Sequence, residues 1–253
     1  MALDIFGLEI RWYGLLFAAA FLLGYQIMQW FCVRENRVNH DLDRLLFYLM
    51  GGTIIGARLG HCIFYDPGYY LSNPVKILAV WEGGLASHGG GVGVLIGLLL
   101  YARKVDESYL WLLDRVVIPA TLAAFFIRTG NLFNSEIVGI PSTLPTAVIF
   151  ERLDLIPRHP AQVYEALSYL SIFGLLMVFY LKTKWATYSG LLTGVFLSLV
   201  FSSRFFIELV KEKQEAYSSG LWLSTGQLLS LPFVIAGLVL IVVAFQKYAG
   251  KSE

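Results

Sequence analysis

The sequence of 253 residues is 57% hydrophobic and only 15% charged. Soluble domains carry about 25% charged residues, so this composition excludes an ordinary soluble protein and indicates a membrane protein. Because the formal net charge is +1 and the chain has neither a basic stripe nor a zinc-finger spacing, no nucleic-acid partner is expected.

Seven apolar stretches follow in chain order, each close to the about 20 residues that a helix needs to cross the hydrocarbon core of a bilayer. They lie near Trp12–Cys32, Leu45–Tyr65, Leu85–Tyr101, Val116–Phe133, Ala161–Leu181, Ser189–Ile207 and Leu221–Phe245. The first is expected to stay in the mature protein, because the acidic amino terminus lacks the basic region and cleavage site of a signal peptide. The third opens with Ser87, His88 and three glycines, which allows a non-helical turn at its start. The sequence predicts an all-α polytopic membrane protein with seven transmembrane helices, forming a single domain over residues 1–253.

The orientation follows from the distribution of Lys and Arg, which favour cytoplasmic loops. The short loops after the first, third and fifth spans, together with the tail, hold more of these residues than the longer segments between them. This places the amino terminus outside and the carboxy terminus inside. The two longest connections, Asp66–Gly84 and Ser135–Pro160, then lie outside and are predicted to form a small extracytoplasmic head.

Polar residues that are rare inside membranes gather at one end of these spans. With the amino terminus outside, they fall on the outer side: Tyr13, Arg58, His61, His88, the segment from Arg128 to Glu136, Glu165, Arg204 and Glu208. A charged group at mid-bilayer costs about 2.5–3.5 kcal/mol on insertion scales, and such groups tend to mark function. Five converging helix ends therefore indicate one outward-facing site.

Small residues predict where helices approach closely. Gly52, Gly56 and Gly60 recur at every fourth position of the second span, and Gly89, Gly93 and Gly97 do so in the third. Glycines at this spacing let two helix backbones pack in contact within lipid. We interpret them as packing residues.

The charged residues admit both structural and functional readings. Arg128 and Arg204 suit a phosphate anion, because guanidinium binds it bidentately, but each could instead pair internally with Glu136, Glu165 or Glu208. Arg58 is balanced between the two readings. His88 is a candidate base, since imidazole titrates near neutrality, or else a capping residue.

Metal and disulfide chemistry find little support in the spacing of residues. Neither H-E-x-x-H nor Glu-x-x-His occurs among the histidines and glutamates, so no metal site is predicted. Cys32 and Cys62 are too few for a disulfide framework and are expected to be structural thiols.

Several motifs spread along nearly the whole chain carry a family resemblance. They are Arg11-Trp12-Tyr13-Gly14, Gly56-Ala57-Arg58-Leu59-Gly60, Ser87-His88-Gly89-Gly90, Arg128 to Gly139, His159-Pro160 to Glu165, Arg204-Phe205-Phe206-Ile207-Glu208 and Gly226-Gln227-Leu228-Leu229-Ser230. With these motifs the chain resembles the prolipoprotein diacylglyceryl transferases of bacteria. The segment from Arg128 to Gly139 is the most specific of them.

The resemblance implies a reaction and its partners. The diacylglyceryl group of phosphatidylglycerol would pass to the lipobox cysteine thiol of a prolipoprotein signal peptide, forming a thioether and releasing glycerol phosphate. The enzyme would be a multi-pass protein of the bacterial cytoplasmic (inner) membrane, with its active site on the extracytoplasmic side and no cofactor. An outward-facing lipid or anion transporter is the alternative, although no internal repeat supports it.

The resemblance also implies roles for individual residues. His88 would remove the thiol proton with Tyr13 near it, and Arg128 and Arg204 would stabilise the departing phosphate. Residues expected to bind phosphatidylglycerol are Arg58, Arg128, Asn131, Asn134, Glu136, Gly139, Arg204 and Lys211. The chain departs from the family pattern at Ser135, where glycine is usual and a different turn is expected, and at Lys211, where arginine is usual.

Overall fold

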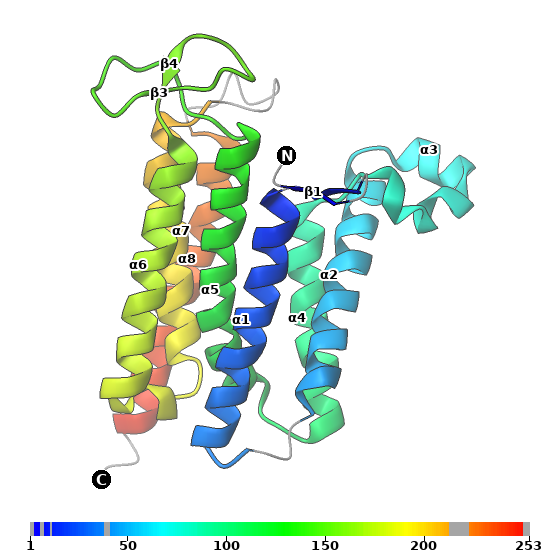
Figure 1. The fold of residues 1–253 in the computed structure, drawn as a ribbon. Coiled ribbons are helices and arrows are strands. Elements are labelled where there is room, and N and C mark those ends of the chain that lie inside the picture. Colours follow the sequence, from blue (N-terminus) through cyan, green and yellow to red (C-terminus); the bar gives the residue numbers. More distant parts are fainter. Residues whose placement is uncertain (1–2, 6–7, 11, 38–40, 213–222, 250–253) are drawn as a thin grey trace. The chain divides into compact units, whose positions relative to one another are not determined.

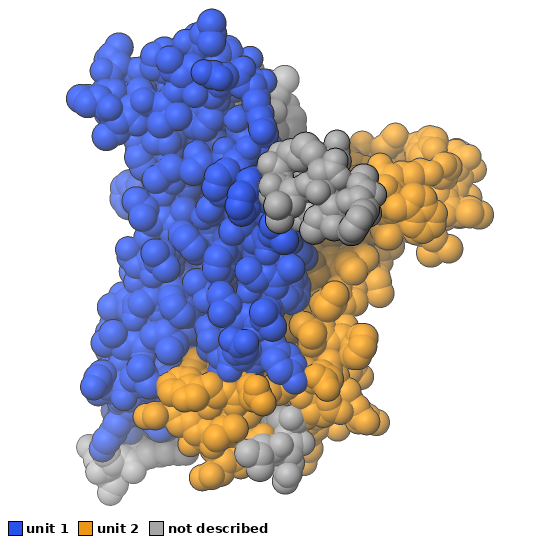
Figure 2. All heavy atoms as spheres, in the orientation of Figure 1, with its two compact units in different colours: residues 1–28, 114–253 blue, residues 29–113 orange. Residues whose placement is uncertain are grey.

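The computed structural model describes residues 3–5, 8–10, 12–37, 41–212 and 223–249 and is mostly helical (Figure 1). The chain divides into two compact units, which Figure 2 colours separately. Unit 1 comprises Met1–Met28 and Asp114–Glu253, and unit 2 comprises Gln29–Leu113. Helices α1, Trp12–Arg34, and α5, Tyr109–Asn134, have residues in both units.

Each predicted span coincides with a helix. Besides α1 and α5 these are α2 Leu42–Phe64, α4 Ser87–Val105, α6 Ala161–Lys182, α7 Leu191–Ile207 and α8 Thr225–Ala249. Residues 221 and 222, where the last span was predicted to begin, lie outside the described residues. In the described part of the chain six helices are long and apolar enough to cross a membrane, and α4 is not among them. The prediction of a helical membrane protein is confirmed, while a seventh crossing and the orientation stay predictions.

Unit 2 is built on close packing between α2 and α4. A Cβ atom on Gly60 would lie 2.8 Å from the Cα of Gly89, and one on Gly93 would collide with the carbonyl oxygen of Gly52. The predicted glycine contact is therefore confirmed. The turn that the sequence allowed at the start of α4 does not form, because Ser87 already begins the helix. Packing against α2 compensates for the low helix propensity of these glycines.

Gly93→Ala is expected to destabilise the α2–α4 pair, because the new methyl group has no space and overpacking costs about 1–3 kcal/mol. Gly91→Ala is the matched control, since nothing lies within 4 Å of a Cβ at Gly91. Alanine there favours the helix by about 0.5–1 kcal/mol. Thermal unfolding in detergent should give a lower midpoint for Gly93→Ala and an equal or higher one for Gly91→Ala. Equal midpoints for both variants would contradict the packing role.

The connection between α2 and α4 folds into an arm, which we define as residues 65–84. It contains α3 Pro67–Ser72 and two 3₁₀ turns, η1 Pro74–Leu78 and η2 Val80–Glu82. Asp66 caps α3 by accepting a hydrogen bond from the backbone nitrogen of Tyr69 at 3.3 Å. Pro67 follows at the first helical position, where its missing N–H is not needed.

In unit 1, α7 packs along both α8 and α6. Gly194 and Gly237 bring α7 and α8 close together, since a Cβ on Gly194 would lie 2.8 Å from the carbonyl oxygen of Gly237. The buried carboxylate of Asp114 caps α7, accepting hydrogen bonds from the backbone nitrogens of Gly190 at 2.6 Å and Thr193 at 2.8 Å. This cap satisfies helix N–H groups that would otherwise be unpaired within the protein.

The connection between α5 and α6 forms a head, which we define as residues 135–160. It contains two short antiparallel strands, β3 Val148–Ile149 and β4 Pro157–Arg158. A further antiparallel pair, β1 Leu3–Ile5 and β2 Leu8–Ile10, precedes α1. The two connections predicted to form one head, Asp66–Gly84 and Ser135–Pro160, belong to different units, so a joint head stays a prediction.

Arg158 connects the head to the chain that follows α7. Its guanidinium donates to Asp154 at 2.6 Å and to Glu212, beyond α7, at 3.1 Å. The hydrogen bond from Arg158 lowers the pKa of Asp154. Asp154 is therefore ionised at neutral pH, and the contact is lost only as the pH falls through that lowered pKa.

Candidate active site

The carboxyl end of α5 carries the segment that the sequence singles out. The nitrogen of Ser135 donates to the carbonyl of Leu132 at 3.1 Å and that of Glu136 to the carbonyl of Asn131 at 2.9 Å. These two bonds form a Schellman cap, whose central residue takes left-handed backbone angles. Ser135 does so, with φ 58°. It adopts the conformation that glycine enters most easily, so serine fits the turn that a glycine would make.

Glu136 holds the two amides that follow Arg128. Asn131 Nδ2 donates to Glu136 Oε2 at 2.9 Å, and Asn134 Nδ2 donates to Glu136 Oε1 at 3.1 Å. Arg128 Nη1 in turn donates to Asn131 Oδ1 at 3.2 Å. The segment therefore presents a guanidinium, two amides and a carboxylate in one hydrogen-bonded chain.

Glu165, on α6, lies between two cations. Its Oε2 is 2.7 Å from Arg128 Nε and its Oε1 is 3.6 Å from Lys211 Nζ, and its side chain is 1% exposed. These contacts are ion pairs without directional hydrogen bonds to the carboxylate. The sequence placed Glu165 among the polar residues of the outward-facing site and named it as one of three possible partners for an arginine, and the ion pair with Arg128 is the one observed. The fold was needed to show that it joins α5 to the chain after α7.

Lys211 and Glu208 extend this charged cluster. Lys211 Nζ is 3.3 Å from Glu208 Oε2, and the Lys211 residue is 8% exposed. Glu208 packs against the start of α8, because a Cβ on Gly226 would lie 2.6 Å from its carboxylate. The single ammonium group of Lys211 thus contacts both glutamates as a point charge.

Arg204, on α7, differs from Arg128 in its partners. Both guanidinium groups act electrostatically on the hydroxyl of Tyr169 from α6, so both lie near the same part of unit 1. Arg204 has no carboxylate partner within the described residues.

Tyr13, at the start of α1, lies against the turn of α5 that follows Arg128. A Cβ on Gly130 would be 2.7 Å from the Tyr13 ring, so only glycine leaves room for it. The Tyr13 hydroxyl is within electrostatic range of Glu136 and Arg128. Arg11, which opens this motif, lies outside the described residues. The fold thus brings Tyr13 to the segment from Arg128 to Glu136.

Gly139 joins three segments of the chain. Its nitrogen donates to the carbonyl of His159 at 2.9 Å, and it forms a backbone bridge with Lys211. A Cβ on Gly139 would lie 2.6 Å from the carbonyl oxygens of both His159 and Val210. In this structure Gly139 lets three backbone segments pack closely together. Its contact with substrate stays a prediction.

His88 and Arg58 belong to unit 2. His88 is an exposed residue in the first turn of α4. Arg58 is 3% exposed and donates to the carbonyls of Ile77 at 2.9 Å and Gly84 at 3.3 Å, and also to those of Lys76 and Gly83. These contacts support the structural reading of Arg58, while its binding of substrate stays a prediction.

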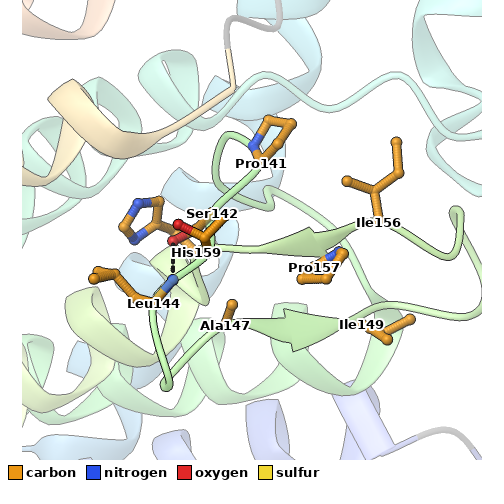
Figure 3. A pocket seen from close by; sticks show the side chains of 9 residues that line it. Pro141, Ser142, Leu144, Ala147, Ile149, Ile156, Pro157 and His159 are labelled. Atoms are coloured by element: carbon orange, nitrogen blue, oxygen red, sulfur yellow. Dashed lines mark hydrogen bonds between the residues drawn. The ribbon is translucent and has the colours of Figure 1, made fainter.

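The head contains an open pocket of about 700 Å³ (Figure 3). It is lined by Pro141, Ser142, Thr143, Leu144, Ala147, Ile149, Ile156, Pro157 and His159. None of these lining residues is Asp, Glu, Lys or Arg. The pocket therefore has a more apolar lining than the charged cluster. His159, one of the lining residues, has its Nδ1 3.3 Å from the hydroxyl of Tyr164 on α6. Within the described residues, no three His, Cys, Asp or Glu side chains are placed to hold a metal ion.

The helices are apolar enough to cross a membrane, and several of them end at a buried cluster of charged residues. This combination is typical of an integral membrane protein with a polar site at its helix ends. The model of the prolipoprotein diacylglyceryl transferase family matches residues 1–243. The chain therefore belongs to this family, and the resemblance found in the sequence is confirmed.

Individual relatives agree with the family match. The phosphatidylglycerol–prolipoprotein diacylglyceryl transferase of Tolumonas auensis is 50% identical over 96% of this chain and 94% of its own length. Those of Chloroherpeton thalassium and Porphyromonas gingivalis are 50% and 48% identical, over 95% and 94% of this chain and 91% and 90% of their own lengths. The similarity thus covers nearly the whole molecule.

Proposed function

We propose that the protein is a transferase that moves the diacylglyceryl group of phosphatidylglycerol to the lipobox cysteine of prolipoproteins. Family membership and relatives of that name over nearly the full length support this function. The observation in the structure that carries it is the pair of guanidinium groups of Arg128 and Arg204. Arg128 is held by Glu165, and Arg204 is unpaired with carboxylates among the described residues. A phosphodiester is an anion that a guanidinium group binds bidentately, which suits Arg204 beside Arg128.

The reaction is a substitution at carbon. The thiol sulfur bonds to the glycerol carbon that carries the phosphate oxygen, and the carbon–oxygen bond breaks. Its electron pair leaves with glycerol phosphate, while the thiol proton passes to a base. Negative charge grows on the departing phosphate, so preorganised arginines stabilise the transition state more than the starting diester.

The thiol requires help to react at neutral pH. Its ordinary pKa of about 8.5 leaves only a few per cent as thiolate at pH 7. We assign proton removal to His88, with Tyr13 as a further polar group of the site. The assignment of His88 rests on imidazole chemistry and on the motif Ser87-His88-Gly89-Gly90.

The remaining residues are assigned to phosphatidylglycerol. Asn131 and Asn134 each keep one amide hydrogen that is not used by Glu136, and these can donate to phosphate or glycerol oxygens. Glu136 orients both amides. Lys211 adds positive charge, and Gly139 and Arg58 are likewise assigned to phosphatidylglycerol binding.

The proposed setting is the bacterial cytoplasmic membrane. The amino terminus lies outside, the carboxy terminus inside, and the charged cluster faces the extracytoplasmic side, where the precursor and phosphatidylglycerol meet. Lys and Arg in the short loops support this orientation. A lipid or anion transporter is not favoured, because the relatives across the whole chain are named as transferases.

Mass spectrometry of a lipobox peptide incubated with the protein and phosphatidylglycerol vesicles tests the function. The peptide should gain the mass of a diacylglyceryl group, and a peptide with serine in place of the lipobox cysteine should not. The nucleophile belongs to the substrate, so the double variant Cys32→Ala with Cys62→Ala should give the same product. A folded double variant without any product would contradict the assignment of the nucleophile, and an unchanged peptide mass with the natural chain would contradict the function.

A further inference from the structure

The arm, residues 65–84, presents large apolar side chains outward. Leu71 is 83% exposed, Val75 and Trp81 are each 79% exposed and Leu78 is 72% exposed. Tyr65 and Tyr69 add two exposed aromatic rings. Protein surfaces rarely leave large apolar groups gathered in this way unless another phase or partner covers them. The arm therefore has a binding surface that the proposed reaction does not use.

The fold of the arm holds these apolar side chains in their exposed positions. Arg58 lies under it and donates to four of its backbone carbonyls, and its guanidinium lies over the ring of Tyr70 at 5.1 Å. The nitrogen of Ala86 closes the segment by donating to the carbonyl of Ala57 at 2.9 Å. Four backbone carbonyls thus bind Arg58, while the large apolar side chains face outward together with a smaller number of polar ones.

The surface continues directly from a membrane-spanning helix. α2 is one of the six helices apolar enough to cross a membrane, and its last residues, Ile63 and Phe64, are 60% and 81% exposed. The arm begins at the next residue. A lipid-facing surface on α2 therefore runs without interruption into the apolar surface of the arm.

The residue types match the interfacial layer of a bilayer. Trp and Tyr are enriched at membrane interfaces, where their rings have both an apolar body and a polar group. The charged side chains of Lys76 and Glu82 pair with each other at 2.6 Å, which lowers the cost of placing them near lipid. Short helices with satisfied backbones and apolar outer faces lie in this layer rather than across the membrane.

We propose that the arm is an interfacial anchor, which lies in the headgroup and upper acyl-chain region at the membrane face where α2 ends. Lipid is the occupant, and Arg58 fixes the shape that presents the anchor to it. The arm then sets the depth of the end of α2. This inference concerns lipid contact and stands whether or not the proposed reaction is correct.

Nitroxide labels in the full chain, reconstituted in vesicles of phosphatidylglycerol and phosphatidylethanolamine, test this placement. Cys32 and Cys62 are replaced by alanine, and one cysteine is introduced as Leu71→Cys or Leu78→Cys, both at exposed positions. Ile55→Cys, 62% exposed on α2, is the lipid reference, and Glu151→Cys on the head is the water reference. If the chain with both alanines does not fold, the labels are placed in the chain that keeps Cys32 and Cys62. Both natural cysteines are buried, so the introduced thiol is the reactive one.

Labels at positions 71 and 78 should collide several-fold more often with dissolved oxygen than with a water-soluble nickel chelate. The ratio of the two collision rates should lie between the ratios measured at the lipid reference and at the water reference. Chelate access equal to that at position 151 would overturn the proposal. So would shielding from both reagents, because that result shows a protein partner or a second copy on the arm. Arg58→Ala should raise the mobility of the label at position 78, and unchanged mobility would contradict the role of Arg58 in shaping the arm.

Discussion

Replacing Arg128 with alanine should lower the rate of thioether formation by about 10²–10³-fold, the usual cost of removing one preorganised donor to a developing negative charge. The effect should fall on kcat, because charge on the leaving phosphate grows only as the carbon–oxygen bond breaks. Arg128→Lys should recover part of the rate, since lysine keeps the charge near Glu165 but loses the planar fork. The measurement is the rate with phosphatidylglycerol vesicles and a lipobox peptide, at several concentrations of each.

Two controls separate chemistry from folding in that experiment. Arg152→Ala removes an exposed arginine of the head that donates to the carbonyl of Phe133 at 3.0 Å, and should leave the rate near that of the natural chain. The thermal midpoint of Arg128→Ala shows whether the variant is folded at the assay temperature. A folded Arg128→Ala variant with an unchanged kcat would refute the anion role.

Glu165→Gln should destabilise the protein strongly. The carboxylate is 1% exposed and neutralises both Arg128 and Lys211, so the variant leaves two cations without their shared partner. Removing one partner of a buried ion pair typically costs about 3–5 kcal/mol. Denaturant unfolding in detergent measures this loss. The activity of the remaining folded protein should also fall, because Arg128 loses the group that positions it.

Glu212→Gln is the matched control for this prediction. Glu212 also pairs with an arginine, Arg158, at 3.1 Å, but its side chain is 48% exposed, and such pairs contribute about 0–1 kcal/mol. If Glu165→Gln and Glu212→Gln unfold at the same denaturant concentration, Glu165 is not the centre of the cluster.

Much of this architecture could be predicted from the sequence, because in a membrane the apolar length of a segment determines whether it forms a spanning helix. The helix positions followed from that rule, and the glycine contact followed from the spacing of Gly52, Gly56 and Gly60. The start of α4 could not be predicted from local propensity. Its glycines are helical because α2 packs against them, and that is a tertiary effect.

The candidate site was predicted in part. Tyr13, Arg128 and the residues up to Gly139 lie together in unit 1, as the convergence of helix ends suggested. The ion pair of Glu165 and the structural use of Arg58 were each one of the alternatives that the sequence allowed, because the choice depends on which group a charged side chain reaches in three dimensions. Spacing along the chain gives no information on a contact such as that between Arg58 and Gly84, 26 residues apart.

The backbone of Gly139 connects the head to the charged cluster. Its backbone is bonded to His159 beside the head pocket and is bridged to Lys211, whose ammonium group pairs with Glu165. Because Gly139 has no side chain, the backbone of the head lies directly against the backbone of Lys211. One lysine therefore connects the head to the carboxylate that positions Arg128.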